Sequence, residues 1–88
     1  MAIKVRGKAV DAETGEPIHF ARVEVIDPKT GKTIDVTATD AEGRFVIEVP
    51  EPGEYEVVLK AQVYQPVSQR VTIEPGVSLT IRSVKVVV

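Results

Sequence analysis

The sequence predicts an all-β fold, a seven-stranded Greek-key β-sandwich formed by a single domain over residues 1–88. Apolar and polar residues alternate in short runs, the pattern of strands that bury one face and expose the other. Gly and Pro turns separate these runs about every ten residues, and no segment has helical spacing. A small barrel is the structural alternative. Greek-key crossings are expected because sequential hairpins alone would leave two sheets poorly closed.

The clearest strand signals lie between Thr39 and Leu59. The inward positions predicted here are Phe45, Ile47 and Val49, followed by Tyr55, Val57 and Leu59. Asp40–Gly43 fits a type I turn, and Pro52–Gly53 fits a type II turn in which Gly53 takes a positive φ. We expect the other strands to be added to this pair.

Two more strands are predicted before residue 27. Ile3–Ala9 places basic residues on one face, and Gly7 within it marks a bulge or the close approach of a packed aromatic ring. Asp11–Pro17 is predicted to be a loop whose turn is closed by Gly15. The second strand is Phe20–Ile26, and its inward positions are Ala21, Val23 and Val25.

A third strand of this half, Thr33–Thr39, follows a turn over Asp27–Gly31. One face of this strand is apolar and consists of Ile34, Val36 and Ala38. Asp35 and the threonines form the other face, which is expected to be exposed to solvent.

The last third of the chain carries two strands and one irregular segment. Gln62–Pro66 is expected to be a kink where the chain changes sheet. Val67–Ile73 is a strand, and Glu74–Gly76 repeats the Pro-Gly turn. The final strand begins at Val77, and its phase slips near Arg82, which indicates a β-bulge. The inward positions after the slip would be Val84, Val86 and Val88.

Composition argues against several functions. The net charge is −2, and the 11 Lys and Arg residues are scattered singly as on solvated strand faces, so no nucleic-acid partner is predicted. No apolar run approaches about 18 residues, so no membrane insertion is predicted. The chain has no cysteine and gives no redox indication of its compartment. Met1–Lys4 leads directly into a strand, so no signal peptide is expected, and the chain is either cytoplasmic or a domain of something larger.

The order of the turn residues resembles the carboxypeptidase regulatory-like domain over Val5–Ile81. The matching motifs are Gly7-x-Ala9-x-Asp11, Thr14-Gly15-Glu16-Pro17-Ile18-x-Phe20-Ala21-x-Val23, Thr39-Asp40-x-x-Gly43-x-Phe45-x-Ile47, Pro52-Gly53-x-Tyr55-x-Val57 and Tyr64-x-Pro66. The sequence departs from that family at Val63, where a Gly usually precedes the Tyr. The form Pro17-Ile18-x-Phe20-Ala21 looks most like the bacterial versions.

The resemblance implies a prealbumin-like sandwich, similar in architecture to transthyretin, with no catalytic residues. Such domains stand beside metallocarboxypeptidase domains, extend TonB-dependent outer-membrane transporters at their N-termini, or form parts of surface proteins. An extracellular or cell-envelope location is therefore implied. Two neighbouring families fit less well. The chain lacks the core Trp of fibronectin type III, and it lacks the Asn of the Lys–Asn isopeptide bond in pilin-like Cna-B domains, although a Lys–Asp bond stays open.

No enzyme is predicted. His19 is the sole histidine, and a general base needs a nucleophile and an orienting acid beside it. None of the serines at positions 68, 78 and 83 lies in a nucleophile-elbow motif. We interpret His19 as a partly exposed strand histidine beside a turn. One histidine without cysteine does not make a zinc site, so no metal or other cofactor is predicted.

Two binding functions remain as alternatives. The acidic loop at Asp11–Glu16 could gather oxygens around Ca²⁺, but it lacks an EF-hand pattern. The simpler interpretation is that Asp11, like Asp27 and Asp40, accepts backbone N–H bonds within its own turn. Sugar binding needs an exposed aromatic platform. Phe45 and Tyr55 are needed for the core, with the Tyr55 hydroxyl bonded to a backbone carbonyl, and Phe20 and Tyr64 are expected to pack at the sheet ends.

The segment Val84–Val88 could complete the core or could pair at a sheet edge with a second chain. The core interpretation is favoured, because a small domain needs every available strand. Lys85 within the segment would discourage edge pairing, so a monomer is favoured over a homodimer. The function favoured by the sequence is a non-catalytic accessory module of a larger secreted or cell-envelope protein, serving as a spacer, folding aid or protein-contact domain with a protein partner or neighbouring domain. The alternatives are an idealised or engineered scaffold without natural activity, since Cys, Trp and Asn are missing, and a weak sugar- or calcium-binding module.

Overall fold

The chain forms seven strands in two sheets, and the predicted all-β sandwich is confirmed. The computed structural model describes residues 2–86, and no helix occurs among them. The strands in chain order are β1 (Ile3–Asp11), β2 (Arg22–Ile26), β3 (Thr33–Ala38), β4 (Arg44–Val49), β5 (Gly53–Lys60), β6 (Val67–Ile73) and β7 (Ser78–Ser83). Accordingly, this part of the chain has no helix long and apolar enough to cross a membrane.

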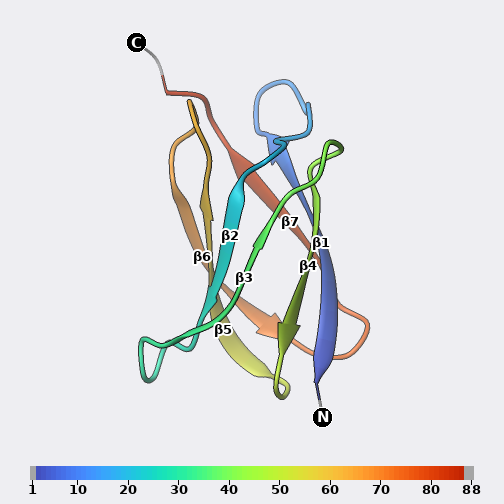
Figure 1. The fold of residues 1–88 in the computed structure, drawn as a ribbon, viewed down its shortest axis with the longest axis vertical. Helices are drawn as coiled ribbons and strands as arrows, with labels where there is room; N and C mark the ends of the chain where they lie inside the picture. Colours follow the sequence, from blue (N-terminus) through green and yellow to red (C-terminus); the bar gives the residue numbers. More distant parts are fainter. Residues whose placement is uncertain (1, 87–88) are drawn as a thin grey trace.

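One sheet has three strands in the order β4-β1-β7, and the other has four in the order β3-β2-β5-β6. The chain crosses between the sheets after β1, β3, β4 and β6, so sequence neighbours are often not sheet neighbours. β1 and β7 pair in parallel, and the other strand pairs are antiparallel. The chain enters the sandwich at one end of its long axis and leaves it at the other (Figure 1).

The inner faces of the two sheets build one apolar core. Most of the predicted inward positions are buried, and the buried apolar side chains are Val5, Ala9, Ile18, Ala21, Val23, Val25, Phe45, Ile47, Val49, Tyr55, Val57, Leu59, Ile73, Leu79 and Ile81. Of the two roles predicted for Gly7, the close approach of an aromatic ring is confirmed, because the Phe45 ring occupies the space of a side chain there. The alternating pattern therefore identified the core correctly.

The predicted pairing of the two clearest strands is wrong, because β4 and β5 lie in different sheets. Pro52–Gly53 carries the chain from one sheet to the other, and Gly53 begins β5 without a positive φ, so no type II turn forms. The Tyr55 ring is buried and its hydroxyl donates to the Glu51 carbonyl at 2.6 Å, as predicted. This bond bridges the connection from β4 to β5 and stabilises it, as hairpin hydrogen bonds would stabilise a turn within one sheet.

The predicted change of sheet at Gln62–Pro66 is also wrong. β5 and β6 pair antiparallel in the same sheet, with Leu59 opposite Val67. Val63, between them, adopts a left-handed conformation with φ of 62° and turns the chain back on itself. The irregular segment is therefore a turn between two antiparallel strands of one sheet and not a crossover to the other sheet.

The faces of β3 differ from the prediction because the bulge of this fold lies between Val25 and Ile26 of β2. The register shift places Asp35 opposite the inward Val25, and the later position Thr39, just after the strand, is buried. Val36, predicted on the apolar face, is exposed. The Asp35 carboxylate accepts the backbone N–H of Glu48 in β4 at 2.8 Å, so this polar face closes the sandwich edge.

The predicted slip near Arg82 does not occur. Ser83 continues the inward phase of β7 and is buried, whereas Val84 and Val86 are exposed, so the preferred core interpretation is wrong for both. Residues 87 and 88 lie outside the described residues. The segment instead pairs its backbone with the return after β5. Gln65 N–H donates to the Val84 carbonyl at 2.9 Å, and Val86 N–H donates to the Val63 carbonyl at 2.8 Å.

Replacing Val63 with glycine is expected to stabilise the domain by about 1 kcal/mol. A left-handed conformation costs a residue with a Cβ about 1–2 kcal/mol, and the greater freedom of glycine in the unfolded chain offsets part of this gain. The side chain is 66% exposed, so little packing is lost. Urea unfolding measures the change. The control Val36→Gly, in the ordinary backbone of β3, should destabilise, and equal effects of the two substitutions would contradict this account.

Candidate functional site

A buried polar cluster lies at the end of the sandwich where the described chain leaves it. Asp11 accepts the backbone N–H of Glu13 at 2.8 Å and that of Thr14 at 3.2 Å, and the Tyr64 hydroxyl donates to its second oxygen at 3.1 Å. Ser83, also buried, donates to the Gln65 carbonyl at 2.6 Å. The cluster connects the loop after β1, the return after β5 and the end of β7.

The two titratable groups of this cluster have shifted pKa values. The backbone hydrogen bond from Glu13 is the main cause that lowers the pKa of Asp11, although burial opposes it. Burial is the main cause that raises the pKa of Tyr64, and the hydrogen bond to Asp11 adds to it. Asp11 is therefore held as a carboxylate and Tyr64 as a phenol, which is the pairing that stabilises their hydrogen bond. We interpret the cluster as a structural clamp.

The acidic loop does not direct its oxygens to one point. Asp11 faces the protein interior, while Glu13, Thr14 and Glu16 are exposed. Within residues 2–86, no three His, Cys, Asp or Glu side chains are placed to hold a metal ion together. The turn-capping interpretation is confirmed for Asp11, and also for Asp27 and Asp40, which accept the N–H groups of the residues two positions later.

His19 and Phe20 form an exposed aromatic pair. Both lie in the connection between β1 and β2, so His19 is not in a strand as predicted. Their rings meet edge to face, with centroids 5.1 Å apart. Phe20 is 76% exposed at φ of 57°, which corrects the expectation that it packs at a sheet end. Tyr64, the other candidate for a sugar platform, is half-buried against the core, so the two aromatics differ in setting.

The serines have no catalytic arrangement in residues 2–86. Ser68 donates to the Glu56 carboxylate at 2.9 Å, Ser83 donates to a carbonyl, and none of the side-chain hydrogen bonds of these residues joins a serine to His19. A shallow depression of about 410 Å³ at the end opposite the polar cluster is lined by the loops Asp27–Lys29 and Glu51–Tyr55 and by Arg70. It holds charges of both signs.

The fold creates a concentration of positive charge that was not predicted from the sequence. The outer face of the three-stranded sheet carries exposed basic side chains from all three of its strands, and we call this the basic face: Lys4, Arg6, Lys8, Arg44 and Arg82. The alternating basic residues of β1 were visible in the sequence. The other two arginines join them only because β4 and β7 flank β1, although they are distant in the sequence.

These features define a prealbumin-like β-sandwich module. Residues 4–86 match the carboxypeptidase regulatory-like domain, and the chain belongs to this family. Comparison with curated protein sequences finds no match.

Several solved structures share the fold. The group B streptococcus pilus 2b backbone protein has a TM-score of 0.74 at 20% identity, covering 93% of this chain and 40% of that one. The Bacillus anthracis TIE protein has a TM-score of 0.74 at 18% identity, covering 98% of this chain and 18% of that one. The 3-chlorocatechol 1,2-dioxygenase from Rhodococcus opacus 1CP has a TM-score of 0.69 at 13% identity, covering 97% and 60%. At these identities the likeness concerns the fold alone, and this chain spans less than two thirds of each protein.

The lysine side chains are not placed to form a Lys–Asp cross-link. Every lysine side chain is exposed, and none in the described residues lies within 4.0 Å of an aspartate oxygen. A Lys–Asp cross-link forms where the two side chains are in contact, so the open expectation of such a bond has no support in this arrangement.

Proposed function

We propose that the chain is a single non-catalytic domain that transmits force as a rigid spacer within a larger secreted or cell-envelope protein. Membership of the carboxypeptidase regulatory-like family and the fold shared with pilus proteins support a module that works as part of a larger chain. One observation carries the mechanical part of the proposal. The first and last strands, β1 and β7, pair directly and in parallel.

The β1–β7 ladder lies in line with the direction in which neighbours would pull. It runs from Arg6 opposite Ser78 to Asp11 opposite Ser83, six residue pairs in all. The chain enters at the start of β1 and leaves beyond the end of β7, at opposite ends of the molecule (Figure 1). The long dimension of the Cα trace is 41 Å. A pull on both ends therefore slides the two strands along each other.

Sliding loads every hydrogen bond of the ladder at the same time. Each bond contributes only about 0.5–1.5 kcal/mol to stability, so a ladder that opens one bond after another yields easily. A sheared ladder must lose all of its bonds in one step, and forced unfolding is governed by the rate of that step. The polar cluster of Asp11 and Tyr64 adds a side-chain bond between the end of β1 and the return that pairs with residues 84–86.

We also propose that the domain has no catalytic activity of its own. Among residues 2–86, His19 is exposed beside Phe20 and has no hydrogen-bonded nucleophile or acid. The polar side chains that are buried, Asp11, Thr39 and Ser83, are all bonded to groups of the fold itself. A general acid–base site needs such groups free to meet a substrate.

Single-molecule pulling tests the proposal. Because the chain has no native cysteine, Ala2→Cys with Val86→Cys places handles that shear β1 against β7, whereas Ala2→Cys with Pro75→Cys peels them apart from one end. We expect one cooperative rupture in each case and a clearly higher force in shear. Equal forces, or gradual extension in the shear geometry, would refute a force-transmitting role.

A further inference from the structure

The charge of this domain is strongly segregated. The basic face holds five cations and one carboxylate, Glu48, a formal charge of +4 in a chain whose net charge is −2, so the rest of the chain carries −6. None of the five cations forms an ion pair within the described residues. Lys8 stands directly opposite Arg44 on the neighbouring strand. Like charges in such a cross-strand pair repel.

On the outer face of the four-stranded sheet, carboxylates neutralise the cations through ion pairs. It carries three cations and three carboxylates, and there too two cations, Arg22 and Lys60, stand opposite each other. Glu24 forms ion pairs with both, 3.2 Å from the Arg22 guanidinium and 3.8 Å from the Lys60 ammonium. Arg70 lies 3.6 Å from Glu54. The same chain therefore forms ion pairs on one outer face and none within the described residues on the other, where Glu48, opposite Lys4, is the single carboxylate among five cations.

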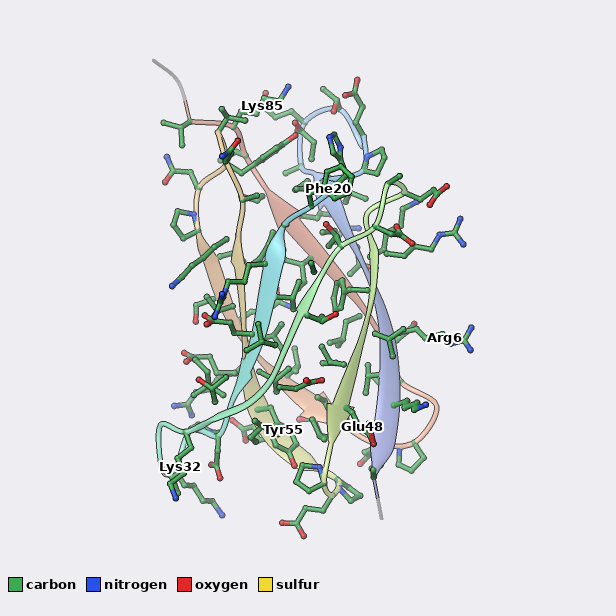
Figure 2. The ribbon with its side chains drawn as sticks, viewed as in Figure 1. Arg6, Phe20, Lys32, Glu48, Tyr55 and Lys85 are labelled. Carbon is green, nitrogen blue, oxygen red and sulfur yellow. The ribbon has the colours of Figure 1, made fainter. Side chains whose placement is uncertain are left out.

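We propose that the basic face docks an acidic protein surface. Charge complementarity is the first argument, because a patch of carboxylates would supply the partners that the five cations lack. Arg6 projects away from the sandwich into solvent, where its guanidinium is free to form two parallel bonds to one carboxylate (Figure 2). The proposal does not depend on the force-transmitting role.

A protein fits this face better than other anions. Val46, opposite Arg6 on the edge strand β4, is 49% exposed and gives the face an apolar contact beside its charges, and protein interfaces combine apolar and charged contacts. No aromatic side chain lies on the face to stack on sugars or bases. A membrane or a long nucleic acid would also extend past the face and meet the acidic remainder of the domain, which repels anions.

Titration with short probes tests the proposal by NMR chemical shifts at physiological ionic strength. The main probe is a peptide with four glutamates around one leucine, and a second has serine in place of leucine. A heparin-type disaccharide and a pentanucleotide of the same charge, and phosphatidylserine vesicles, represent the other classes. We expect the leucine peptide to bind most tightly, with shifts confined to the basic face and to Val46.

Charge-reversal variants locate the site. K8E with R44E should weaken binding of the leucine peptide about tenfold, because two contacting cations become repulsive. K4E with R82E should act similarly, which guards against a single misfolded variant. The control K29E with K32E, in the exposed β2–β3 loop, makes the same change in net charge and should leave affinity unchanged. V46S should weaken binding of the leucine peptide but not of the serine peptide.

Four outcomes would overturn the proposal: equal loss in the control, tighter binding of either charge-matched anion or of the vesicles, shifts centred elsewhere, or shifts that arise from self-association without a probe. Pulling experiments measure the β1–β7 ladder and not this face. Failure of the docking proposal would therefore leave the mechanical one standing, and the reverse is also true.

Discussion

Replacing Gly7 with alanine is expected to destabilise the domain by about 3 kcal/mol, the upper end of the cost of overpacking a core. The new methyl group would overlap the Phe45 ring, whose Cε1 lies 2.8 Å from the position of a Cβ. That ring is buried between the two sheets, so moving it would disturb the packed side chains around it. Because small domains are stable by only about 5–15 kcal/mol, urea unfolding should show a large drop in the midpoint.

Two comparisons isolate the steric cause. Gly53→Ala should cost little or stabilise, because Gly53 has no positive φ and the nearest atom to its Cβ, Tyr55 Cε2, is 3.9 Å away. Gly7→Ala should also cost less in a Phe45→Leu background, where the ring is gone. A double-mutant cycle with no coupling between positions 7 and 45 would show that the loss comes from strand propensity and not from the ring.

The sequence was informative where a single strand decides the outcome. The alternation of Phe45, Ile47 and Val49 fixes which side faces the core, whatever the strand pairs with. The close contact at Gly7 could be predicted because glycine weakens a strand, so its presence there indicates a bulge or a closely packed neighbour. The turns that end at Gly43 and Gly76 were also predicted, because they depend on local geometry, and both glycines have positive φ values, 76° and 88°.

Features that depend on strands from distant parts of the chain were not predicted from the sequence. The bulge at Val25 shifts the register of β3 by one residue, and a one-residue shift exchanges the faces of a strand. This exchange placed Thr39 inside and Val36 outside. The same limit applies to the candidate interface, because Arg44 and Arg82 become neighbours of Lys8 only through the sheet order β4-β1-β7. Scattered charges in the sequence were therefore not scattered on the surface.

Thr39 faces the core because of this register shift, and its buried hydroxyl contributes to stability. Its side chain is 2% exposed, and its hydroxyl accepts the N–H of Ala21 and donates to the carbonyl of Ile18, both at 2.8 Å. Its own carbonyl accepts the N–H of Phe20 at 3.1 Å. One side chain thus satisfies two backbone groups of the irregular segment that leads into β2, where Phe20 holds a left-handed conformation.

Thr39→Val is therefore expected to cost about 3 kcal/mol. Valine keeps the shape but leaves a buried N–H and a buried carbonyl without partners, and each loss costs about 1–3 kcal/mol. Urea unfolding measures the total, and hydrogen exchange at the Ala21 amide reports the broken bond directly. Thr39→Ser keeps the hydroxyl and should cost less, and Thr37→Val, where no side-chain hydrogen bond is present within residues 2–86, should be nearly neutral. If position 39 tolerated valine as well as position 37 does, the hydroxyl would not be what anchors the entry to β2, and the strain at Phe20 would need another restraint.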